Sequence, residues 1–212
     1  MNAFLLLDYA GVAVFAATGA LAASRKQLDI IGFIFLAAVT GIGGGTFRDL
    51  ILDVPVVWVA NPDYLIVCAI VAVIVYFTAH LVESRYKLLL WLDALGLSAY
   101  AVLGAYKGLV VTGSAEVAVV MGVLTATFGG ILRDLLANEP SVLLRPEVYV
   151  TAALAGAFVF TLLHIALGPD AWLVATILGF CTAFFVRAGA LRFGWSFPPY
   201  RGRPGRRPED IP

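Results

Sequence analysis

The residues best suited to chemistry are an arginine and an aspartate that follow a cluster of glycines inside an apolar segment. The segment GGGTFRD contains Gly43, Gly44, Gly45, Arg48 and Asp49. Charged side chains inside a membrane are costly, and they usually pair with each other or face a water-filled pathway. Carbonyls freed at a helix break can replace part of a cation's hydration shell. The motif therefore suggests the passage of ions.

The same pattern occurs a second time at a constant distance along the chain. The second segment, FGGILRD, contains Phe128, Gly129, Gly130, Arg133 and Asp134. Arg133 lies 85 positions after Arg48, and Asp93 lies 85 positions after Asp8, without a gap between them. A fixed offset over many positions indicates an internal duplication.

The composition predicts an integral membrane protein. Of the 212 residues, 61% are hydrophobic and 13% are charged, whereas a soluble domain has roughly 25% charged residues. The formal net charge is zero, so bulk electrostatics predicts no nucleic-acid partner. Cys68 and Cys181 lie in apolar stretches with no metal-ligand spacing, and we expect them to be packing residues. No metal site and no cofactor are predicted.

Seven apolar stretches reach the length of roughly 20 residues that a membrane helix needs. They cover about 4–23, 30–52, 63–82, 88–106, 115–137, 147–167 and 170–190. The predicted fold is an all-α membrane protein with one transmembrane domain over 1–191. The repeats, about 4–84 and 89–167, hold three spans each, so the second should be inverted relative to the first, with a seventh helix added. Inverted repeats are typical of proteins that move solutes.

Basic residues outside the spans predict the orientation. Most gather on one side: Arg25, Lys26, Arg85, Lys87, Arg145 and arginines 192, 201, 203, 206 and 207. The other side has Lys107, which we place in a connector. The richer side should be cytoplasmic, so the N-terminus should face outward and the C-terminus inward across a cell membrane. The tail, 192–212, is rich in Pro, Gly and Arg. We expect it to be disordered or loosely bound at the surface, where its arginines would contact anionic lipid.

The glycine clusters allow two interpretations. Each glycine weakens a helix by about 1 kcal/mol relative to alanine, so a break or kink that lines a pathway is favoured in both repeats. The alternative is close helix packing, because Gly41 and Gly45 form a GxxxG pair. Three adjacent glycines exceed what such a pair needs, since adjacent positions face different directions on a helix.

The buried charges should form pairs within each repeat. Their depths in the predicted spans favour Asp8 with Arg48 near the outer mouth, and Asp93 with Arg133 near the inner one. Asp49 and Asp134 point about 100° away around the helix and should serve the span ends or another partner. The alternative is that all these side chains extend to the headgroup region.

The doubled motif and the seven spans resemble the trimeric intracellular cation (TRIC) channel family in its prokaryotic branch. The resemblance covers residues 4–190. It implies a homotrimer in a bacterial plasma membrane, with a potassium-permeable, monovalent-cation-selective pore in each subunit. It also implies that the second and fifth spans line this pore and kink at the glycine motifs. The segment AYKGLVV has Lys107 but lacks the glutamate of the animal family's basic-acidic-valine motif.

The predicted function is therefore passive conduction of cations, potassium among them. The alternative is a secondary transporter of a small solute such as an amino acid, because inverted repeats and broken helices also fit carriers. A lipid-organising membrane scaffold is a third class. Neither HExxH, nor GxSxG, nor a Walker loop occurs in the sequence, so an enzyme is not predicted.

Overall fold

The computed structural model describes residues 3–142, 148–198 and 205; most of these residues are helical, and they form no strand. The helices are α1 (Ala3–Arg25), α2 (Ile30–Ile51), α3 (Val57–Ala60), α4 (Asp63–Thr78), α5 (Arg85–Thr112), α6 (Ala115–Leu136), α7 (Val150–Leu167) and α8 (Trp172–Phe193), with short 3-10 helices η1 (Ala79–Leu81) and η3 (Pro169–Ala171). Seven are long and apolar enough to cross a membrane. The predicted fold class is confirmed.

Local sequence explains where the helices begin and end. Asp29 accepts a hydrogen bond from the Gly32 backbone at the start of α2, and Ser84 and Ser114 cap α5 and α6 in the same way. Such caps satisfy N–H groups that lack a partner within the helix. Gly113 adopts a left-handed conformation, with φ of 69°, which ends α5. The chain therefore turns directly from α5 into α6.

Helix α5, which is the fourth of the predicted membrane spans, is longer than predicted. It contains 28 residues and runs to Thr112, whereas the sequence suggested an end near residue 106. Lys107 therefore lies within α5, and the placement of Lys107 in a connector is wrong. The structural reason is that Lys107 lines a cavity and pairs with Asp49, so a lysine here does not mark the end of a span.

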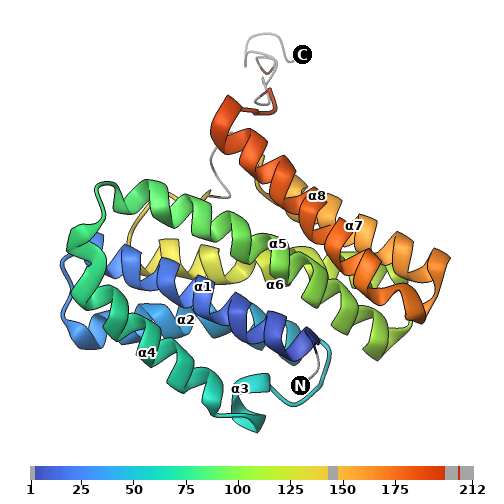
Figure 1. Ribbon diagram of the computed structural model, residues 1–212, viewed down its shortest axis with the longest axis horizontal. Coiled ribbons are helices and arrows are strands. Elements are labelled where there is room, and N and C mark those ends of the chain that lie inside the picture. Colours follow the sequence, from blue (N-terminus) through green and yellow to red (C-terminus); the bar gives the residue numbers. More distant parts are fainter. Residues whose placement is uncertain (1–2, 143–147, 199–204, 206–212) are drawn as a thin grey trace, which may run out of the picture.

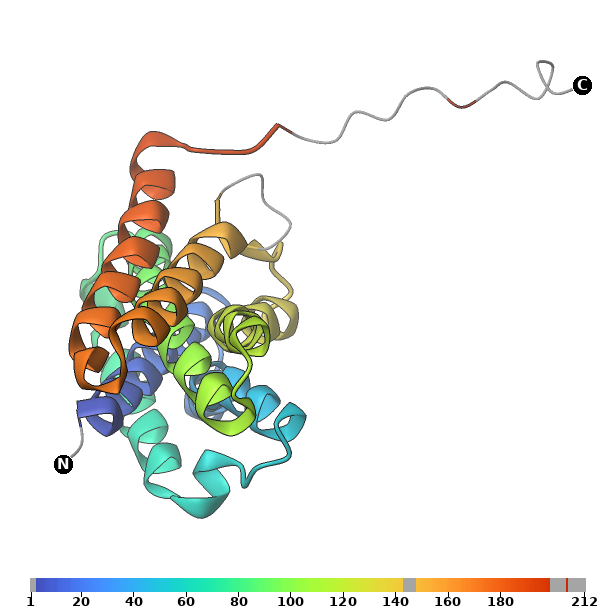
Figure 2. The same ribbon diagram turned by 90° about the vertical axis from the view of Figure 1, so that its right-hand side faces the viewer.

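Helix α5 lies at the centre of the bundle and contacts α1, α6, α7 and α8 (Figure 1). Helices α1, α2 and α4 pack together on one side of it, and α7 and α8 pack together on the other. In Figure 2 the orange and red helices α7 and α8 lie above the blue and teal helices α2 and α4. The core between them is rich in alanine, and it includes Phe15, Leu97 and Phe160.

The two predicted repeats correspond element by element. Helix α2 spans 30–51 and α6 spans 115–136, so both ends differ by the offset of 85 positions. Asp53 and Asn138, also 85 positions apart, have positive φ angles of 52° and 48° directly after these helices. The first repeat contributes α1, α2 and α4, the second contributes α5, α6 and α7, and α8 is additional.

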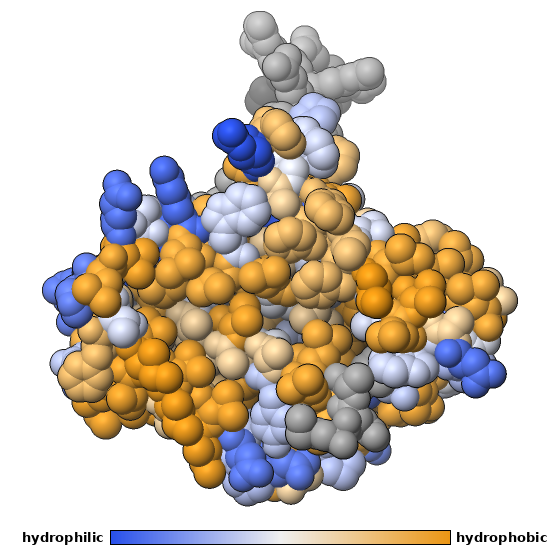
Figure 3. Space-filling model, in the orientation of Figure 1, coloured by the Kyte–Doolittle hydropathy of each residue, from blue (hydrophilic) through white to orange (hydrophobic). Residues whose placement is uncertain are grey.

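The outer surface suits a membrane. In Figure 3 apolar side chains cover most of the visible face, and hydrophilic residues gather toward its edges. Large exposed apolar residues come from several helices and include Ile31, Phe77, Leu135 and Phe185. In a soluble protein a continuous exposed apolar surface would be a liability, whereas lipid tails cover it at no such cost.

Candidate functional site

The glycine motifs lie where α2 and α6 cross. A Cβ atom on Gly44 would overlap the carbonyl oxygen of Thr125, and a Cβ on Gly129 would overlap that of Thr40. Each helix therefore brings a glycine against the backbone of the other. Both helices remain α-helical throughout the motifs, so neither helix is broken at Gly43–Gly45 or Phe128–Gly130, and the kink predicted at these residues stays a prediction. Close packing, the alternative, explains the two central glycines.

The two motifs differ at their first position. Phe128 stands where the first repeat has Gly43, and its ring stacks on Phe47 with 3.9 Å between centroids and 8° between planes. Across the crossing, Leu132 approaches Gly43, where a Cβ atom would lie 3.0 Å from its Cδ1 atom. Aromatic and leucine side chains thus complete the α2–α6 contact. The stacking of Phe128 on Phe47 explains why the second motif has a phenylalanine where the first has Gly43.

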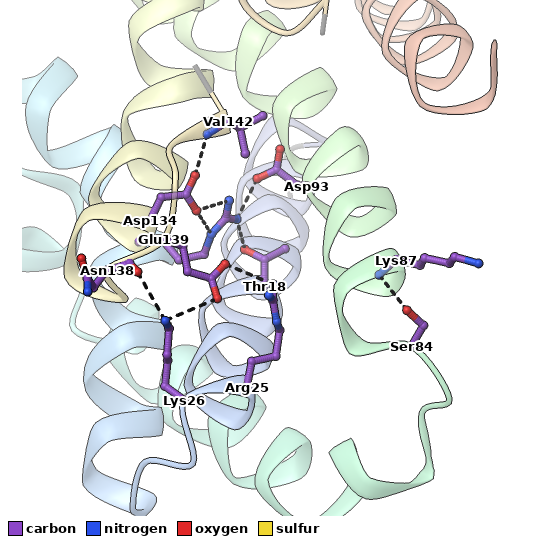
Figure 4. A network of polar contacts seen from close by, with 11 residues as sticks. Thr18, Arg25, Lys26, Ser84, Lys87, Asp93, Asp134, Asn138, Glu139 and Val142 are labelled. Carbon is purple, nitrogen blue, oxygen red and sulfur yellow. Dashed lines mark hydrogen bonds and ion pairs between the residues drawn. The ribbon is translucent and has the colours of Figure 1, made fainter. Parts of the chain in front are cut away.

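A fully buried charge cluster surrounds Arg133. Its Nη1 atom donates to Asp93 Oδ1 at 2.8 Å and to Thr18 Oγ1 at 3.0 Å, and its Nε atom donates to Asp134 Oδ1 at 2.9 Å. We call these four residues the second cluster. Figure 4 shows Thr18, Asp93 and Asp134 converging on one guanidinium. The predicted Asp93–Arg133 pair is present.

The counterpart in the first repeat has different partners. Arg48 Nε donates to Asp49 Oδ1 at 2.8 Å, and Lys107 Nζ contacts the same oxygen at 2.7 Å. Asp8 instead accepts a hydrogen bond from Tyr64 Oη at 2.9 Å. The predicted Asp8–Arg48 pair is wrong, because among the described residues Arg48 forms its only ion pair with its own neighbour. We call these five residues the first cluster.

Asp49 and Asp134 also hold the loops that follow their helices. Asp49 Oδ2 accepts from the Val57 backbone at 3.0 Å, and Asp134 Oδ2 accepts from Val142 at 2.8 Å. These bonds agree with the expectation that both aspartates serve the span ends, although each aspartate also accepts a hydrogen bond from the arginine before it. A guanidinium on a long side chain can curl back to the next residue, although the two Cβ atoms diverge around the helix.

A cavity of about 820 Å³ opens beside the first cluster. Its lining combines charged, polar and apolar side chains from α1 to α8: Leu5, Asp8, Arg48, Val57, Asn61, Tyr64, Leu103, Tyr106, Lys107, Val110, His164, Pro169 and Trp172. The sequence reasoning included neither Lys107 nor His164 in the site. No spacing rule links them to the motif, because they approach it only through the packing of α5 and α7.

The end of α8 packs against the second repeat. Arg187 is fully buried, donates to the Val148 carbonyl at 3.2 Å and lies over the Tyr149 ring. The Trp195 ring covers Gly189, where a Cβ atom would overlap it, and the Trp195 carbonyl accepts from the Val148 backbone at 3.3 Å. The structure describes residues 192–198 and 205 of the predicted tail, and the rest of it lies outside the described residues.

Several basic residues used to predict the orientation lie outside the described residues. These are Arg145 and arginines 201, 203, 206 and 207. Arg25 and Lys26 lie at and just after the end of α1, where both contact Glu139 at 3.1 and 4.0 Å (Figure 4). They join the first repeat to the loop after α6. Among the described residues no group of three potential metal ligands occurs.

These features define a polytopic α-helical membrane protein with two matching three-helix units and a buried charge cluster in each. A protein-family model described as glycine transporter matches the chain twice, over residues 5–80 and 90–165. The two matched ranges are separated by the same 85 positions as the motifs.

Relatives and solved structures agree on the family. A UPF0126 membrane protein of Vibrio cholerae is 39% identical over 92% of this chain and 82% of its own length. The UPF0126 inner membrane protein YadS of Escherichia coli is 35% identical over 92% of this chain and 94% of its own. The TRIC trimeric intracellular cation channel orthologue from Rhodobacter sphaeroides is 51% identical, with a TM-score of 0.88 over 92% of this chain and all of its own.

The chain belongs to this bacterial membrane-protein family and is a prokaryotic member of the TRIC channel family. The likeness supports an ion channel in a membrane. The solved relatives are channels rather than enzymes, and the names of the other relatives give no enzymatic activity.

Proposed function

We propose that this chain forms a passive channel for monovalent cations, potassium among them, with a pore in each subunit of a homotrimer. The observation that carries the proposal is the pair of matched Arg–Asp motifs on α2 and α6, two helices that cross at glycines. Charged groups are kept inside membrane proteins mainly along solute pathways. The likeness to a trimeric cation channel at 51% identity supports the same assignment.

The two clusters would mark opposite ends of the pathway. Asp8 belongs to the first cluster and Thr18 to the second, and both lie on α1. At a rise of 1.5 Å per residue these ten positions correspond to about 15 Å along the helix. The cavity beside the first cluster would be the outer vestibule, with the N-terminus outside and the C-terminus cytoplasmic. Each subunit would then place one charge cluster near each mouth of its pore.

The crossing of α2 and α6 would be the closed point of the pathway. Gly44 and Gly129 bring the two backbones into contact, which leaves no space for an ion between these helices at that depth. Opening would require a bend at Gly43–Gly45 and at Phe128–Gly130, or a separation of the helices. Glycine makes such a bend possible because it weakens a helix locally.

Recording from the purified protein in planar bilayers under a potassium gradient tests the proposal. We expect unitary current steps whose reversal potential follows the potassium equilibrium potential, and bilayers without protein as the control should show none. Saturable uptake and exchange of a small solute without unitary steps would instead favour a secondary transporter, as the family description of a glycine transporter suggests. A lipid-organising scaffold would show neither.

A further inference from the structure

Three buried polar atoms at the second cluster form no hydrogen bond with the described residues. They are Asp93 Oδ2, Arg133 Nη2 and the hydroxyl of Tyr149. Arg133 Nη2 lies 2.9 Å from Asp134 Oδ1 but makes no hydrogen bond to it. In Figure 4 only one oxygen of Asp93 bonds to the guanidinium. Tyr149 is 2% exposed, and the other two residues have no measurable exposure. Because a buried polar group without a partner is costly, these atoms indicate a polar ligand.

Gly130 brings the three side chains around one point. A Cβ atom on Gly130 would lie 2.9 Å from the Tyr149 hydroxyl, 3.4 Å from Asp93 Oδ1 and 3.6 Å from Arg133 Nη2. These are the atoms that such a Cβ would meet first outside the helix backbone, and all of them are polar. A methyl group would gain no apolar contact with them. Glycine instead leaves space beside three polar groups, and a water molecule needs only about 30 Å³.

The first repeat satisfies the equivalent residues by direct contact. Tyr64 and Asp8 stand 85 positions before Tyr149 and Asp93, and the Tyr64 hydroxyl donates to Asp8 Oδ2 at 2.9 Å. Gly45, the counterpart of Gly130, would place a Cβ atom no closer than 3.8 Å to any such neighbour. The same tyrosine and aspartate therefore bond directly in the first repeat, whereas in the second they need a bridging molecule.

The charges around the second cluster indicate that this molecule is neutral. Asp93 and Asp134 are balanced by Arg133 and by Arg187, whose buried guanidinium lies 5.1 Å from the centre of the Tyr149 ring. Two acids and two bases leave no formal net charge. A bound cation would lie against the Arg133 guanidinium, and a bound anion would lie against the Asp93 carboxylate, so Coulomb repulsion disfavours both.

We propose that one buried water molecule binds beside Gly130 and bridges Tyr149, Asp93 and Arg133. The water donates to Asp93 Oδ2, accepts from Arg133 Nη2 and exchanges a third hydrogen bond with the Tyr149 hydroxyl. Buried waters typically make about three hydrogen bonds to polar groups that otherwise lack a partner. The second repeat thus contains a water-mediated form of the direct tyrosine–aspartate bond of the first repeat.

A crystal structure of the full-length protein, at a resolution that shows ordered water, tests the proposal. The crystals are grown with rubidium in place of potassium, because rubidium gives an anomalous signal and water does not. We expect a density peak within about 2.5–3.2 Å of Asp93 Oδ2, Arg133 Nη2 and the Tyr149 hydroxyl, which is hydrogen-bond distance. We expect no anomalous signal at that peak.

Two equivalent glycines provide a matched pair of variants. Gly130→Ala places a methyl group among the three polar groups and should displace the water, so its crystal structure should lack the peak. Gly45→Ala is the control, because it leaves the second cluster unchanged and should keep the peak. Gly130→Ala should also unfold about 2–4 °C below Gly45→Ala in detergent, since it leaves buried polar groups without a partner.

Several results would overturn the proposal. An anomalous rubidium peak at the site would show a cation in place of water. A direct hydrogen bond between the Tyr149 hydroxyl and Asp93, with no peak between them, would show that no bridge is needed. A peak that persists in Gly130→Ala would show that the glycine does not provide the site. The wild-type crystal structure decides the proposal even if Gly130→Ala does not fold.

Discussion

Arg133 and Asp93 form an ion pair of 2.8 Å in which neither side chain has measurable exposure. Their counterparts 85 positions earlier, Arg48 and Asp8, line one cavity without forming such a pair. One sequence motif therefore gives two arrangements. Neighbours outside the motif differ between the two clusters, because Thr18 binds Arg133 in the second, whereas Leu103 stands at the equivalent position beside Arg48 and Lys107 joins the first.

This difference predicts unequal costs for matched substitutions. Asp93→Asn should destabilise the protein by about 3–5 kcal/mol, because it leaves Arg133 buried with one charged partner fewer. Asp8→Asn should cost about 1 kcal/mol or less, since the amide oxygen can still accept from Tyr64. Thermal unfolding in detergent, followed by circular dichroism, measures both. Equal losses would mean that Asp8 is as firmly paired as Asp93.

The hydroxyl of Thr18 should contribute to the second cluster. Thr18→Val removes the acceptor for Arg133 Nη1 and should destabilise the protein by roughly 1–3 kcal/mol, the cost of a buried donor left open. Thr161→Val is the control, because the Thr161 hydroxyl is also buried but bonds only the Ala157 carbonyl of its own helix. The same unfolding assay compares them. A smaller loss for Thr18→Val than for the control would contradict the role of Thr18.

Adjacent glycines should respond differently to alanine. Gly44→Ala places a methyl group against the Thr125 carbonyl and should cost about 1–3 kcal/mol through overpacking. Gly45→Ala meets its nearest atom at 3.8 Å, so it should be neutral or should stabilise the protein by up to about 1 kcal/mol through helix propensity. Unfolding temperatures in detergent distinguish the two. If Gly44→Ala is as stable as Gly45→Ala, the helices do not cross as closely as described.

Truncation should separate the packed end of α8 from the residues beyond it. Ending the chain after Leu191 removes Phe193 and Trp195, and with them the ring that covers Gly189. This truncation should lower the unfolding temperature and increase aggregation in detergent. Ending the chain after Pro198 keeps both aromatic side chains and should have little effect. Size-exclusion chromatography and unfolding curves give the comparison, and indistinguishable behaviour would make Trp195 peripheral.

Composition and repetition were sufficient to predict the fold class and the positions of the spans. Helices α2 and α6 end within one residue of the expected limits, whereas α5 runs past its expected end near residue 106 to Thr112. The Asp93–Arg133 pair was predictable because depth along a helix follows from counting residues. Depth did not predict the partner of Asp8, since Tyr64 comes from another helix and no sequence spacing reveals its approach.

The helix at the glycine motif shows a second limit of sequence reasoning. Three glycines lower helix propensity, which favoured a break, yet tertiary packing keeps the helix continuous. The sequence of α2 alone does not contain the Thr125 carbonyl that fills the place of a side chain at Gly44. Lys107 shows the same limit, because its partner Asp49 lies 58 positions away.

The unequal pairing of Arg48 and Arg133 also bears on the history of the chain. After a duplication both copies begin with the same sequence and the same structural role. The sequence of one copy can change only while the other copy still stabilises the fold. Here Arg133 of the second copy is held by Asp93, Asp134 and Thr18, and it stabilises the fold. Arg48 of the first copy instead borders a cavity together with Leu103, the residue of the second copy that stands 85 positions after Thr18, so the same motif has a different environment in each copy.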